Sequence, residues 1–338
     1  MIKNLLNKLL SFNDLTKDEM FQLLNNIMQG NVTPAQISAI LIALRMKKET
    51  VSEIAGAAMA MKQNALQFEI ETSTPIIDTC GTGGDGSDTF NISTASAFVV
   101  AGAGITVAKH GNRAISSKCG SADVLLELGV NLNASKEVII DSIQNNGIGF
   151  LFAPNMHPAM KYVMPVRKEL STRTIFNILG PLANPVKLSG QVIGVFDQAL
   201  TAPIAETLGE LGTKKALVVH GKGGYDEIIC HDTTQISELN PDGTATTYQF
   251  EPKEFFSQSY DLKDFAGGTT KDNAQIIRDI LSGKLTGAKK DIVVLNAAAG
   301  IIVGEKANNF AEAIKLAKES IEGGYALNKL NKLIEATN

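Results

Sequence analysis

The sequence is poor in the residues that build covalent or metal-bound frameworks. Its 338 residues include no tryptophan, three cysteines and four histidines. The cysteines, Cys80, Cys119 and Cys230, are widely spaced and odd in number, so they indicate no disulfide framework. No spacing of cysteines and histidines is typical of a zinc site. A chain of this length can bury a sizeable core without such cross-links.

The sequence also lacks a basic surplus and long hydrophobic runs. Its formal net charge of −4 does not favour nucleic acid, so any anion site has to be a local basic pocket. The longest apolar runs, near residues 97–108 and 292–304, are shorter than the roughly 20 residues that cross a membrane. Residues 1–10 resemble an amphipathic helix more than a signal peptide. We predict a cytoplasmic enzyme with no membrane partner and no nucleic-acid partner.

Two kinds of sequence pattern divide the chain. Over residues 1–65 apolar residues recur at helical spacing, and Thr16, Thr33 and Thr50 mark helix starts. From Pro75 onward, short apolar runs alternate with helical patterns, which is typical of a parallel sheet covered by helices.

These patterns predict the fold class. The helical, basic stretch Met160–Leu182 interrupts the alternation, and we assign it to the helical part. Later strands are expected at Gln191–Phe196, Ala216–His220, Gln235–Leu239, Thr244–Phe250 and Asp291–Leu295. We predict an α/β protein with a small all-helical N-terminal domain and a larger α/β domain whose mainly parallel central sheet is flanked by helices. The small domain covers residues 1–72, joined by helices from about 160–185, and the larger one covers 73–159 and 186–338.

A glycine-rich loop lies between a predicted strand and a predicted helix in the segment 78–96. Four of the six residues from Gly81 to Gly86 are glycine, so the backbone can adopt positive φ and bring N–H groups close to an anion. Ser93 and Thr94 add hydroxyls at the helix start, where the helix dipole favours negative charge. A turn made of glycines for geometry alone is the alternative, but the surrounding polar residues favour a phosphate site.

A second polar segment begins at Lys109, after a strand predicted at 105–108. Both segments should lie at the carboxyl edge of the sheet, where open α/β sheets bind ligands. Lys109 and Arg113 would neutralise phosphates, and Ser116 and Ser117 would supply hydrogen-bond donors. A solvated basic turn is the alternative for this segment taken alone.

Asp226 and Glu227 follow another predicted strand and a glycine-containing turn. Adjacent carboxylates on a loop suit Mg²⁺, which few protein oxygens hold and which shares its other positions with phosphate and water. Taken alone, such a pair is usually surface decoration. Only its predicted position at a strand end favours a metal site.

Arg167 presents a planar fork that matches a carboxylate, so it can hold an acidic co-substrate. A salt bridge to Glu169 or another surface acid fits the sequence equally well. His157 also has two interpretations, because it either lines the site or is a loop histidine without a role. Neither Cys80 nor Cys119 has a base nearby in the sequence, so we assign no nucleophile.

Together, the segments 78–96, 109–117 and 173–185 and the Asp226-Glu227 pair resemble the anthranilate phosphoribosyltransferase family, and the resemblance spans nearly the whole chain. It implies the nucleoside phosphorylase-II, or class III phosphoribosyltransferase, fold group and a homodimer. It also implies a pentosyltransferase of tryptophan biosynthesis, which uses Mg²⁺ to transfer the phosphoribosyl group of phosphoribosyl pyrophosphate (PRPP) to the amine of anthranilate.

The resemblance further implies site residues. PRPP contacts are expected at Gly81, Gly84, Asp85, Thr89, Asn91, Ile92, Ser93, Thr94, Lys109, His110, Gly111, Asn112, Arg113, Ala114, Ile115, Ser116, Ser117 and Ser121. Two Mg²⁺ ions per subunit are expected at Ser93, Asp226 and Glu227. Anthranilate contacts are expected at Gly81, Asn112, His157, Arg167 and Gly180. Lys109 is expected to act electrostatically, with no residue as acid, base or nucleophile.

Two other functions fit parts of the sequence. A pyrimidine nucleoside phosphorylase shares the fold, but its glycine loop usually has a Lys-His-Ser-Thr-Gly-Gly pattern that this chain lacks. A catalytically silent relative that binds nucleic acid predicts a basic stripe and loss of the metal residues, whereas this chain is acidic and keeps Asp226 and Glu227. One departure from the family pattern is Ser171, where relatives often have glycine, and it concerns local helix geometry.

Overall fold

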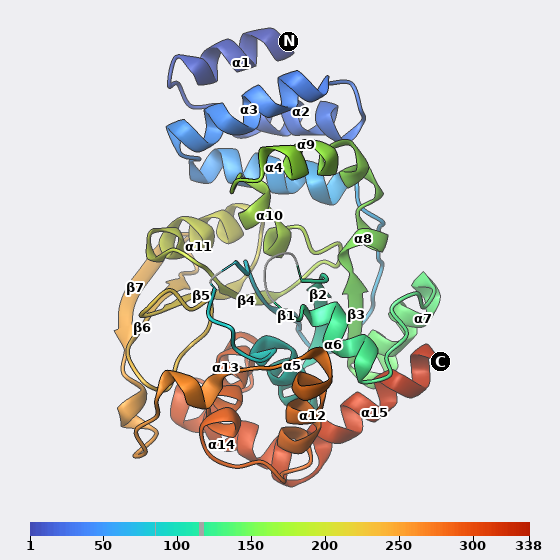
Figure 1. The fold of residues 1–338 in the computed structure, drawn as a ribbon, viewed down its shortest axis with the longest axis vertical. Coiled ribbons are helices and arrows are strands. Elements are labelled where there is room, and N and C mark those ends of the chain that lie inside the picture. Colours follow the sequence, from blue (N-terminus) through green and yellow to red (C-terminus); the bar gives the residue numbers. More distant parts are fainter. Residues whose placement is uncertain (85, 115–117) are drawn as a thin grey trace.

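The computed structural model describes residues 1–84, 86–114 and 118–338. A stack of helices forms one end of the molecule, and a sheet covered by helices forms the rest (Figure 1). Among the described residues, no helix is both long enough and apolar enough to cross a membrane.

Four N-terminal helices form the outer part of the stack. They are α1 (Ile2–Leu10), α2 (Lys17–Met28), α3 (Pro34–Lys47) and α4 (Val51–Gln63). Capping boxes start α2, α3 and α4 at Thr16, Thr33 and Thr50. In each box the threonine oxygen accepts a hydrogen bond from the N–H three residues on, and the side chain there accepts one in return. The three predicted helix starts are confirmed.

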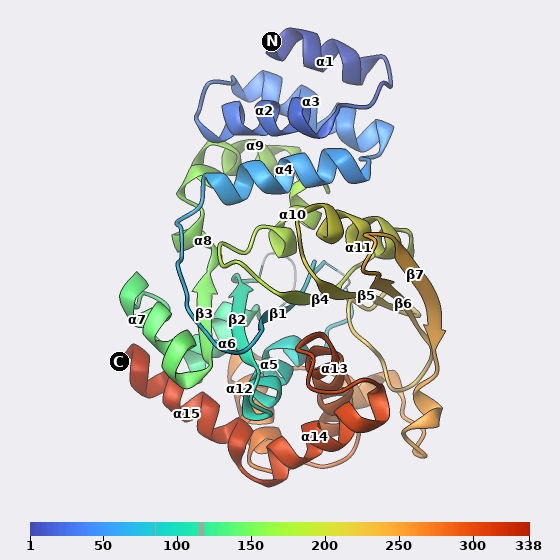
Figure 2. The same cartoon turned by 180° about the vertical axis from the view of Figure 1, so that it is seen from behind.

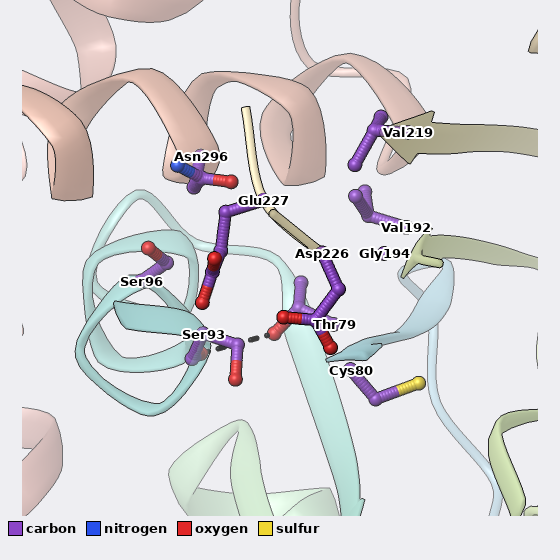
Figure 3. A pocket seen from close by; sticks show the side chains of 10 residues that line it. All are labelled: Thr79, Cys80, Ser93, Ser96, Val192, Gly194, Val219, Asp226, Glu227 and Asn296. Carbon is purple, nitrogen blue, oxygen red and sulfur yellow. Dashed lines mark hydrogen bonds between the residues drawn. The ribbon is translucent and has the colours of Figure 1, made fainter. Parts of the chain in front are cut away.

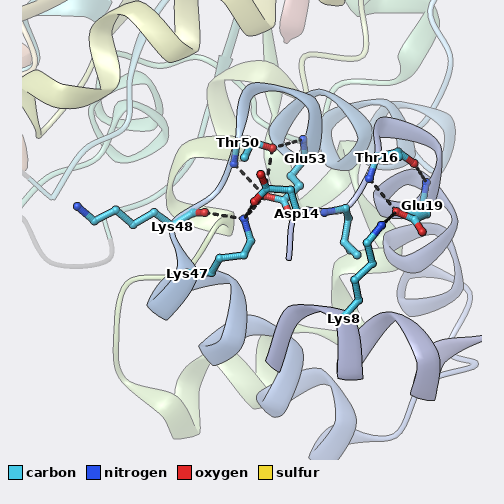
Figure 4. Close-up of polar contacts among 9 residues, drawn as sticks. Lys8, Asp14, Thr16, Glu19, Lys47, Lys48, Thr50 and Glu53 are labelled. Atoms are coloured by element: carbon cyan, nitrogen blue, oxygen red, sulfur yellow. Dashed lines mark hydrogen bonds and ion pairs between the residues drawn. The ribbon is translucent and has the colours of Figure 1, made fainter. Parts of the chain in front are cut away.

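A buried ion cluster fastens these helix ends together (Figure 4). The side chain of Glu53 is fully buried and accepts hydrogen bonds from the backbone N–H groups of Leu15 and Thr50, at 2.9 and 2.8 Å. Lys47 Nζ lies 2.8 Å from Glu53 Oε2 and 2.6 Å from Asp14 Oδ1. Because the buried charges are paired and hydrogen-bonded, the cluster joins the α1–α2 connection, the end of α3 and the start of α4.

The basic stretch assigned to the helical part forms two short helices after a 3₁₀ turn at Pro158–Tyr162. Helix α9 (Met164–Leu170) contacts α3, and helix α10 (Phe176–Leu182) contacts α4. Val166 and Leu179 are buried in the same apolar core as the N-terminal helices. The exact limits of the two domains stay a prediction.

A single seven-stranded sheet forms the centre of the α/β part. Its strands are β1 (Ile76–Gly81), β2 (Thr106–Gly111), β3 (Ile148–Phe152), β4 (Gly190–Gly194), β5 (Lys215–Gly221), β6 (Thr234–Leu239) and β7 (Ala245–Phe250). The order is β3-β2-β1-β4-β5-β6-β7. The first five strands in this order pair in parallel, whereas β6 pairs antiparallel with both β5 and β7. The mainly parallel sheet and the strands predicted at 191–196, 216–220, 235–239 and 244–250 are confirmed to within two residues.

Helices cover both faces of the sheet (Figure 2). One face carries α5 (Ile92–Gly102), α12 (Thr270–Leu281), α13 (Ala288–Val303), α14 (Phe310–Glu322) and α15 (Tyr325–Thr337). The other face carries α11 (Thr201–Glu210), which also contacts α4. Short helices α6 (Ser121–Glu127), α7 (Lys136–Asp141) and α8 (Ala153–Met156) lie beside β2 and β3 (Figure 1).

One predicted strand is wrong. Residues 291–295 belong to helix α13, whose side chains from Ile292 to Val303 are all buried. A short run of β-branched residues looks the same in a buried strand and in a helix that is covered on every side, because neither shows an amphipathic period. Helix α13 is covered by α5 and α14 and packs on β1, β4 and β5, and this packing decides the helical form.

Candidate active site

The candidate site lies where the strand order of the sheet changes direction. From β1 the chain continues to β2 and β3 on one side, and β4 and β5 follow on the other side of β1. The parallel strands β1 and β4 pair up to Gly81 and Gly194 at their carboxyl ends. In open α/β sheets the crevice outside such a switch point is the usual ligand site.

The glycine-rich loop begins at this point. Strand β1 extends to Gly81, the first glycine of the loop, and Gly83, Gly84 and Gly86 have φ values of 64°, 72° and 73°. Residues other than glycine rarely adopt these angles, so the sequence explains the backbone here. The expected PRPP contact at Asp85 lies outside the described residues.

Helix α5 follows the loop and presents the predicted hydroxyls in its first turn. Ser93 lines a small cavity beside the sheet, and Thr94 Oγ1 is buried without a hydrogen-bond partner among the described residues. Asn91 precedes the helix, and its amide is already engaged, because it donates to Cys119 O and accepts from Asn273 Nδ2. Ile92 is buried in the apolar core. Thr89 pairs in an isolated bridge with Ala266.

The acidic pair reaches the same place from a distant part of the chain. Ser93, Asp226 and Glu227 line one cavity of about 20 Å³, together with Thr79 and neighbouring residues (Figure 3). The Asp226 carboxylate accepts a hydrogen bond from the N–H of Gly83 at 2.8 Å. A Cβ atom on Gly81 would lie 2.2 Å from Asp226 Oδ2, so the acidic loop packs directly on the end of β1.

The donor set of this cavity fits a magnesium ion. Hydroxyl and carboxylate oxygens are hard ligands of the kind that Mg²⁺ prefers. No three histidine, cysteine, aspartate or glutamate side chains in the described part of the chain gather as a metal cluster. A site with so few protein ligands matches Mg²⁺, which keeps water and substrate phosphate as its remaining ligands.

Lys109 lies beneath this cavity as part of β2, where it is buried and donates to Thr79 O and, at 3.3 Å, to Ser93 Oγ. Burial lowers the pKa of Lys109, and the negative charge of the fully buried Asp78 opposes that shift. Asn184 Nδ2 donates to Asp78 Oδ2 at 3.0 Å. The predicted basic turn therefore begins inside a strand, with its ammonium held under the site.

A much larger cavity, of about 570 Å³, opens beside the glycine loop between the sheet edge and the helical part. It is lined by all five residues expected to contact anthranilate and by several expected to contact PRPP. The lining residues named in the prediction are Gly81, His110, Gly111, Asn112, Arg113, Ala114, His157, Arg167 and Gly180. Gly84, Thr89, Asn91, Ile92, Thr94, Lys109 and Ser121 line neither of the two cavities.

Two histidines face each other in the wall of the larger cavity. Their rings are 5.1 Å apart, and His110 Nδ1 lies 3.2 Å from the carbonyl oxygen of Gly180. A carbonyl only accepts, so Nδ1 carries the proton and Nε2 of His110 is an acceptor. Burial lowers the pKa of His110 to about 3 and that of His157 to about 4, so both rings are neutral near pH 7. Nε2 of each ring is buried without a hydrogen-bond partner among the described residues.

Arg167 enters the larger cavity from α9. No carboxylate in the described ranges forms an ion pair with it, so the predicted alternative of a salt bridge to Glu169 is absent there. Its guanidinium carbon lies 5.5 Å from the ring centre of Phe176, and burial lowers its pKa. A half-buried cation with no acidic partner is suited to an anionic ligand.

The segment after β2 is held by a residue that sequence reasoning missed. Asp123 accepts hydrogen bonds from the N–H groups of Ala114 and Gly120 and forms a 3.0 Å ion pair with Arg113. Ser121 Oγ donates to Asn112 O. The expected contacts at Ile115, Ser116 and Ser117 lie outside the described residues. The only signal for Asp123 was its place near the start of the apolar run at 122–128, which forms α6, because acids are common in the first turn of a helix.

Fold and site together define a glycosyl transferase with a helical bundle and an α/β domain. The helical bundle domain of the glycosyl transferase family matches residues 3–65, and the a/b domain of that family matches residues 73–327. The anthranilate phosphoribosyltransferase of Methanocorpusculum labreanum is 51% identical over 334 residues, which cover 99% of this chain and 97% of that one. The chain belongs to the anthranilate phosphoribosyltransferase family.

Solved structures agree with this assignment. The anthranilate phosphoribosyltransferase of Thermus thermophilus superposes with a TM-score of 0.93 at 38% identity, with 98% of each chain covered. The Saccharomyces cerevisiae enzyme, in complex with PRPP and Mg, superposes with a TM-score of 0.90 at 30% identity over 99% of this chain and 97% of that one. The yeast enzyme has also been solved with 4-fluoroanthranilate.

Proposed function

We propose that this chain transfers the phosphoribosyl group of PRPP to the amino group of anthranilate, with the switch-point crevice divided into a donor side and an acceptor side. The observation that supports this proposal most directly is the position of Gly81. It lines the large cavity, and a Cβ atom there would collide with Asp226 of the small oxygen-lined cavity. A sugar carbon at Gly81 would have pyrophosphate oxygens on one side and the amine on the other.

On the donor side, the glycine loop and the first turn of α5 bind the phosphates through backbone N–H groups and hydroxyls. Ser93, Asp226 and Glu227 would hold Mg²⁺, which when bound neutralises charge on the pyrophosphate. Lys109 adds positive charge below Ser93, at a position fixed by its hydrogen bonds in β2. These groups stabilise the negative charge that develops on the departing pyrophosphate.

On the acceptor side, Arg167 binds the carboxylate of anthranilate, and the neutral rings of His110 and His157 border the aromatic ring. An arylamine is a neutral nucleophile with an available lone pair, so the reaction requires no activating base. Burial raises the pKa of Cys80, which keeps this nearby thiol protonated and argues against a covalent intermediate. We infer an in-line displacement with inversion at C1 of the ribose, through an oxocarbenium-like state. Closing of the helical part over the sheet would exclude water from the donor.

The test is a direct assay. The purified chain is mixed with anthranilate, PRPP and Mg²⁺, and the loss of anthranilate fluorescence is followed. We expect anthranilate to be consumed and this consumption to stop when Mg²⁺ is chelated. A separate assay with uridine and phosphate as substrates should show no turnover. A well-folded protein that leaves anthranilate unchanged under these conditions would disprove the proposal.

Three further expectations stay predictions, two from the family resemblance and one from the composition of the sequence. A homodimer is tested by the mass of the protein in solution, and two Mg²⁺ ions per subunit by metal titration in the presence of PRPP. The cytoplasmic location is tested by fractionation of the source cells.

A further inference from the structure

The glycine loop is fastened on two sides by parts of the α/β domain. The N–H of Thr82 donates to Gly194 O at 2.9 Å, which extends the pairing of β1 with β4. The N–H of the next residue, Gly83, donates to Asp226 at 2.8 Å. Each anchor comes from the sheet or from the acidic loop beside it.

The third anchor comes from the opposite part of the molecule. Arg173, in the connection between α9 and α10, donates from Nη2 to Gly84 O at 2.5 Å. Its guanidinium carbon lies 4.0 Å from the ring centre of Phe196, and the N–H of Phe196 donates to Thr82 Oγ1 at 3.1 Å. The guanidinium therefore contacts the loop directly and also through an aromatic ring that is attached to the same loop.

Helix α3 holds the segment that carries this arginine. Arg45 Nη1 donates to Thr172 Oγ1 at 2.7 Å and to the carbonyl oxygen of Arg173. Ser171, at the end of α9, has a φ of 46°, which turns the chain back toward the glycine loop. A continuous set of contacts thus runs from α3 through Arg45 and Arg173 to Gly84.

The loop needs such anchors because of its composition. Glycines lose more backbone entropy on ordering than other residues do. A Cβ atom on Gly83 would find nothing within 4 Å, so no close packing confines that part of the loop. Side-chain anchors reduce the ordering that a bound ligand would otherwise have to impose.

We propose that Arg173 is a positioning residue for the phosphoribosyl donor, holding the glycine loop in its phosphate-binding form, and that Arg45 connects this function to the helical part. The proposal rests on the proposed function, because it assigns the glycine loop to PRPP. Arg173 is not assigned a contact with either substrate.

The first test compares Arg173→Ala with Lys168→Ala, which removes another exposed positive charge near the end of α9. We expect Arg173→Ala to raise KM for PRPP about tenfold, the effect of losing one charge-assisted hydrogen bond, with KM for anthranilate changed less than about twofold. Arg173→Lys should recover part of the loss, and Lys168→Ala should match the wild type. An unchanged KM for PRPP, or equal changes for both substrates together with a lower urea midpoint, would overturn the proposal.

The second test is a double-mutant cycle. Arg45→Ala should raise KM for PRPP by a smaller factor, about threefold, and should add little in an Arg173→Ala background because the two residues act in series. Independent, multiplying effects would refute the connection to the helical part. If the wild type did not consume anthranilate, the proposed function would fail. Calorimetric titration with PRPP and Mg²⁺ would then test the positioning role of Arg173 by itself. Arg173→Ala must then weaken PRPP binding, and equal affinity would reject its role.

Discussion

The two cavities at the switch point are built in opposite ways. The small one, of about 20 Å³, is enclosed by the ends of β1 and β4, the first turn of α5 and the acidic loop, all within the α/β part. The large one, of about 570 Å³, has one wall on the sheet and the other on α9, α10 and the segment before them. Of the residues that the structure describes, Cys80 alone lines both.

This difference indicates which part of the reaction is preorganised. The oxygen donors of the small cavity come from the first turn of α5 and from the acidic loop, so the metal site is assembled from residues of the α/β part. The large cavity takes its shape from both the sheet and the helical part, which share an apolar core, and Arg167 reaches it from α9. We therefore expect substitutions in the small cavity to affect turnover itself and those in the large cavity to affect acceptor binding.

The largest effect should come from removing the acidic charges. The double variant Asp226→Asn, Glu227→Gln should lower kcat on the order of 10³-fold, because it removes the carboxylates that would hold Mg²⁺. Rates measured over a range of Mg²⁺ concentrations would show this loss, with a thermal melt as the control for folding. Wild-type turnover in a folded double variant would show that the carboxylates of the small cavity are not needed for the reaction.

A smaller loss, in kcat/KM for both substrates, is expected from Gly81→Ala. The new Cβ would lie 2.2 Å from Asp226 Oδ2, so this carboxylate must shift and lose its hydrogen bond from the N–H of Gly83. A displacement of about 1 Å can cost on the order of 10²-fold in kcat/KM. Gly180→Ala offers a matched case in the large cavity, since a Cβ there has nothing within 4 Å, and it should change KM for anthranilate alone. Equal effects of the two variants would contradict the division.

Arg167→Ala should alter acceptor use only. We expect KM for anthranilate to rise about 10- to 100-fold, since one charge-assisted contact is lost, while KM for PRPP stays within about twofold. Steady-state kinetics with each substrate varied in turn would separate these constants. If the variant impaired only the use of PRPP, the assignment of the two cavities would be reversed.

The smallest effect concerns the two buried histidines. Their folded pKa values, about 3 and about 4, lie below the ordinary 6.5, so between these limits the unfolded chain binds more protons. The stabilisation is complete above about pH 6.5 and is lost as the pH falls, by up to about 1.4 kcal/mol per pH unit for each histidine. Urea unfolding of wild type and His157→Gln between about pH 5 and pH 7 should show a shallower pH dependence for the variant. Identical slopes would show that His157 binds protons equally in the folded and the unfolded chain, so that its pKa is not lowered by folding.

Much of the fold was accessible from local patterns. The threonine caps, the helical spacing of residues 1–65 and the alternation after Pro75 each depend on neighbours in the chain, and the structure agrees with them. The exception at 291–295 arises from burial on every side, which erases the period that separates helix from strand.

The candidate site divides in the same way. Its glycine loop, basic segment and acidic pair were each visible as motifs, because phosphate and metal binding require particular residue types at strand ends. The roles of Asp78, Asn184 and Arg173 were not visible, although these residues lie in those segments, since their partners are far away in the sequence. The role of Asp123 was not visible either, because its contacts depend on how the segment after β2 folds back on α6. Nothing local distinguishes Asn184 from any other asparagine, although its amide joins Asp78 to the carbonyl oxygen of Ala108.

By itself, the sequence determined the α/β class, the helical N-terminal part and the residue types that bind phosphate and Mg²⁺, because propensity, capping and glycine conformation act over a few residues. Only the tertiary structure decided that Asp226 lies against Gly81, that Arg167 has no acidic partner among the described residues, and that Arg173 reaches the glycine loop. These relations connect residues that are dozens to more than a hundred positions apart. Sheet order and core packing bring these residues together, and both depend on contacts across the whole chain rather than on any single segment.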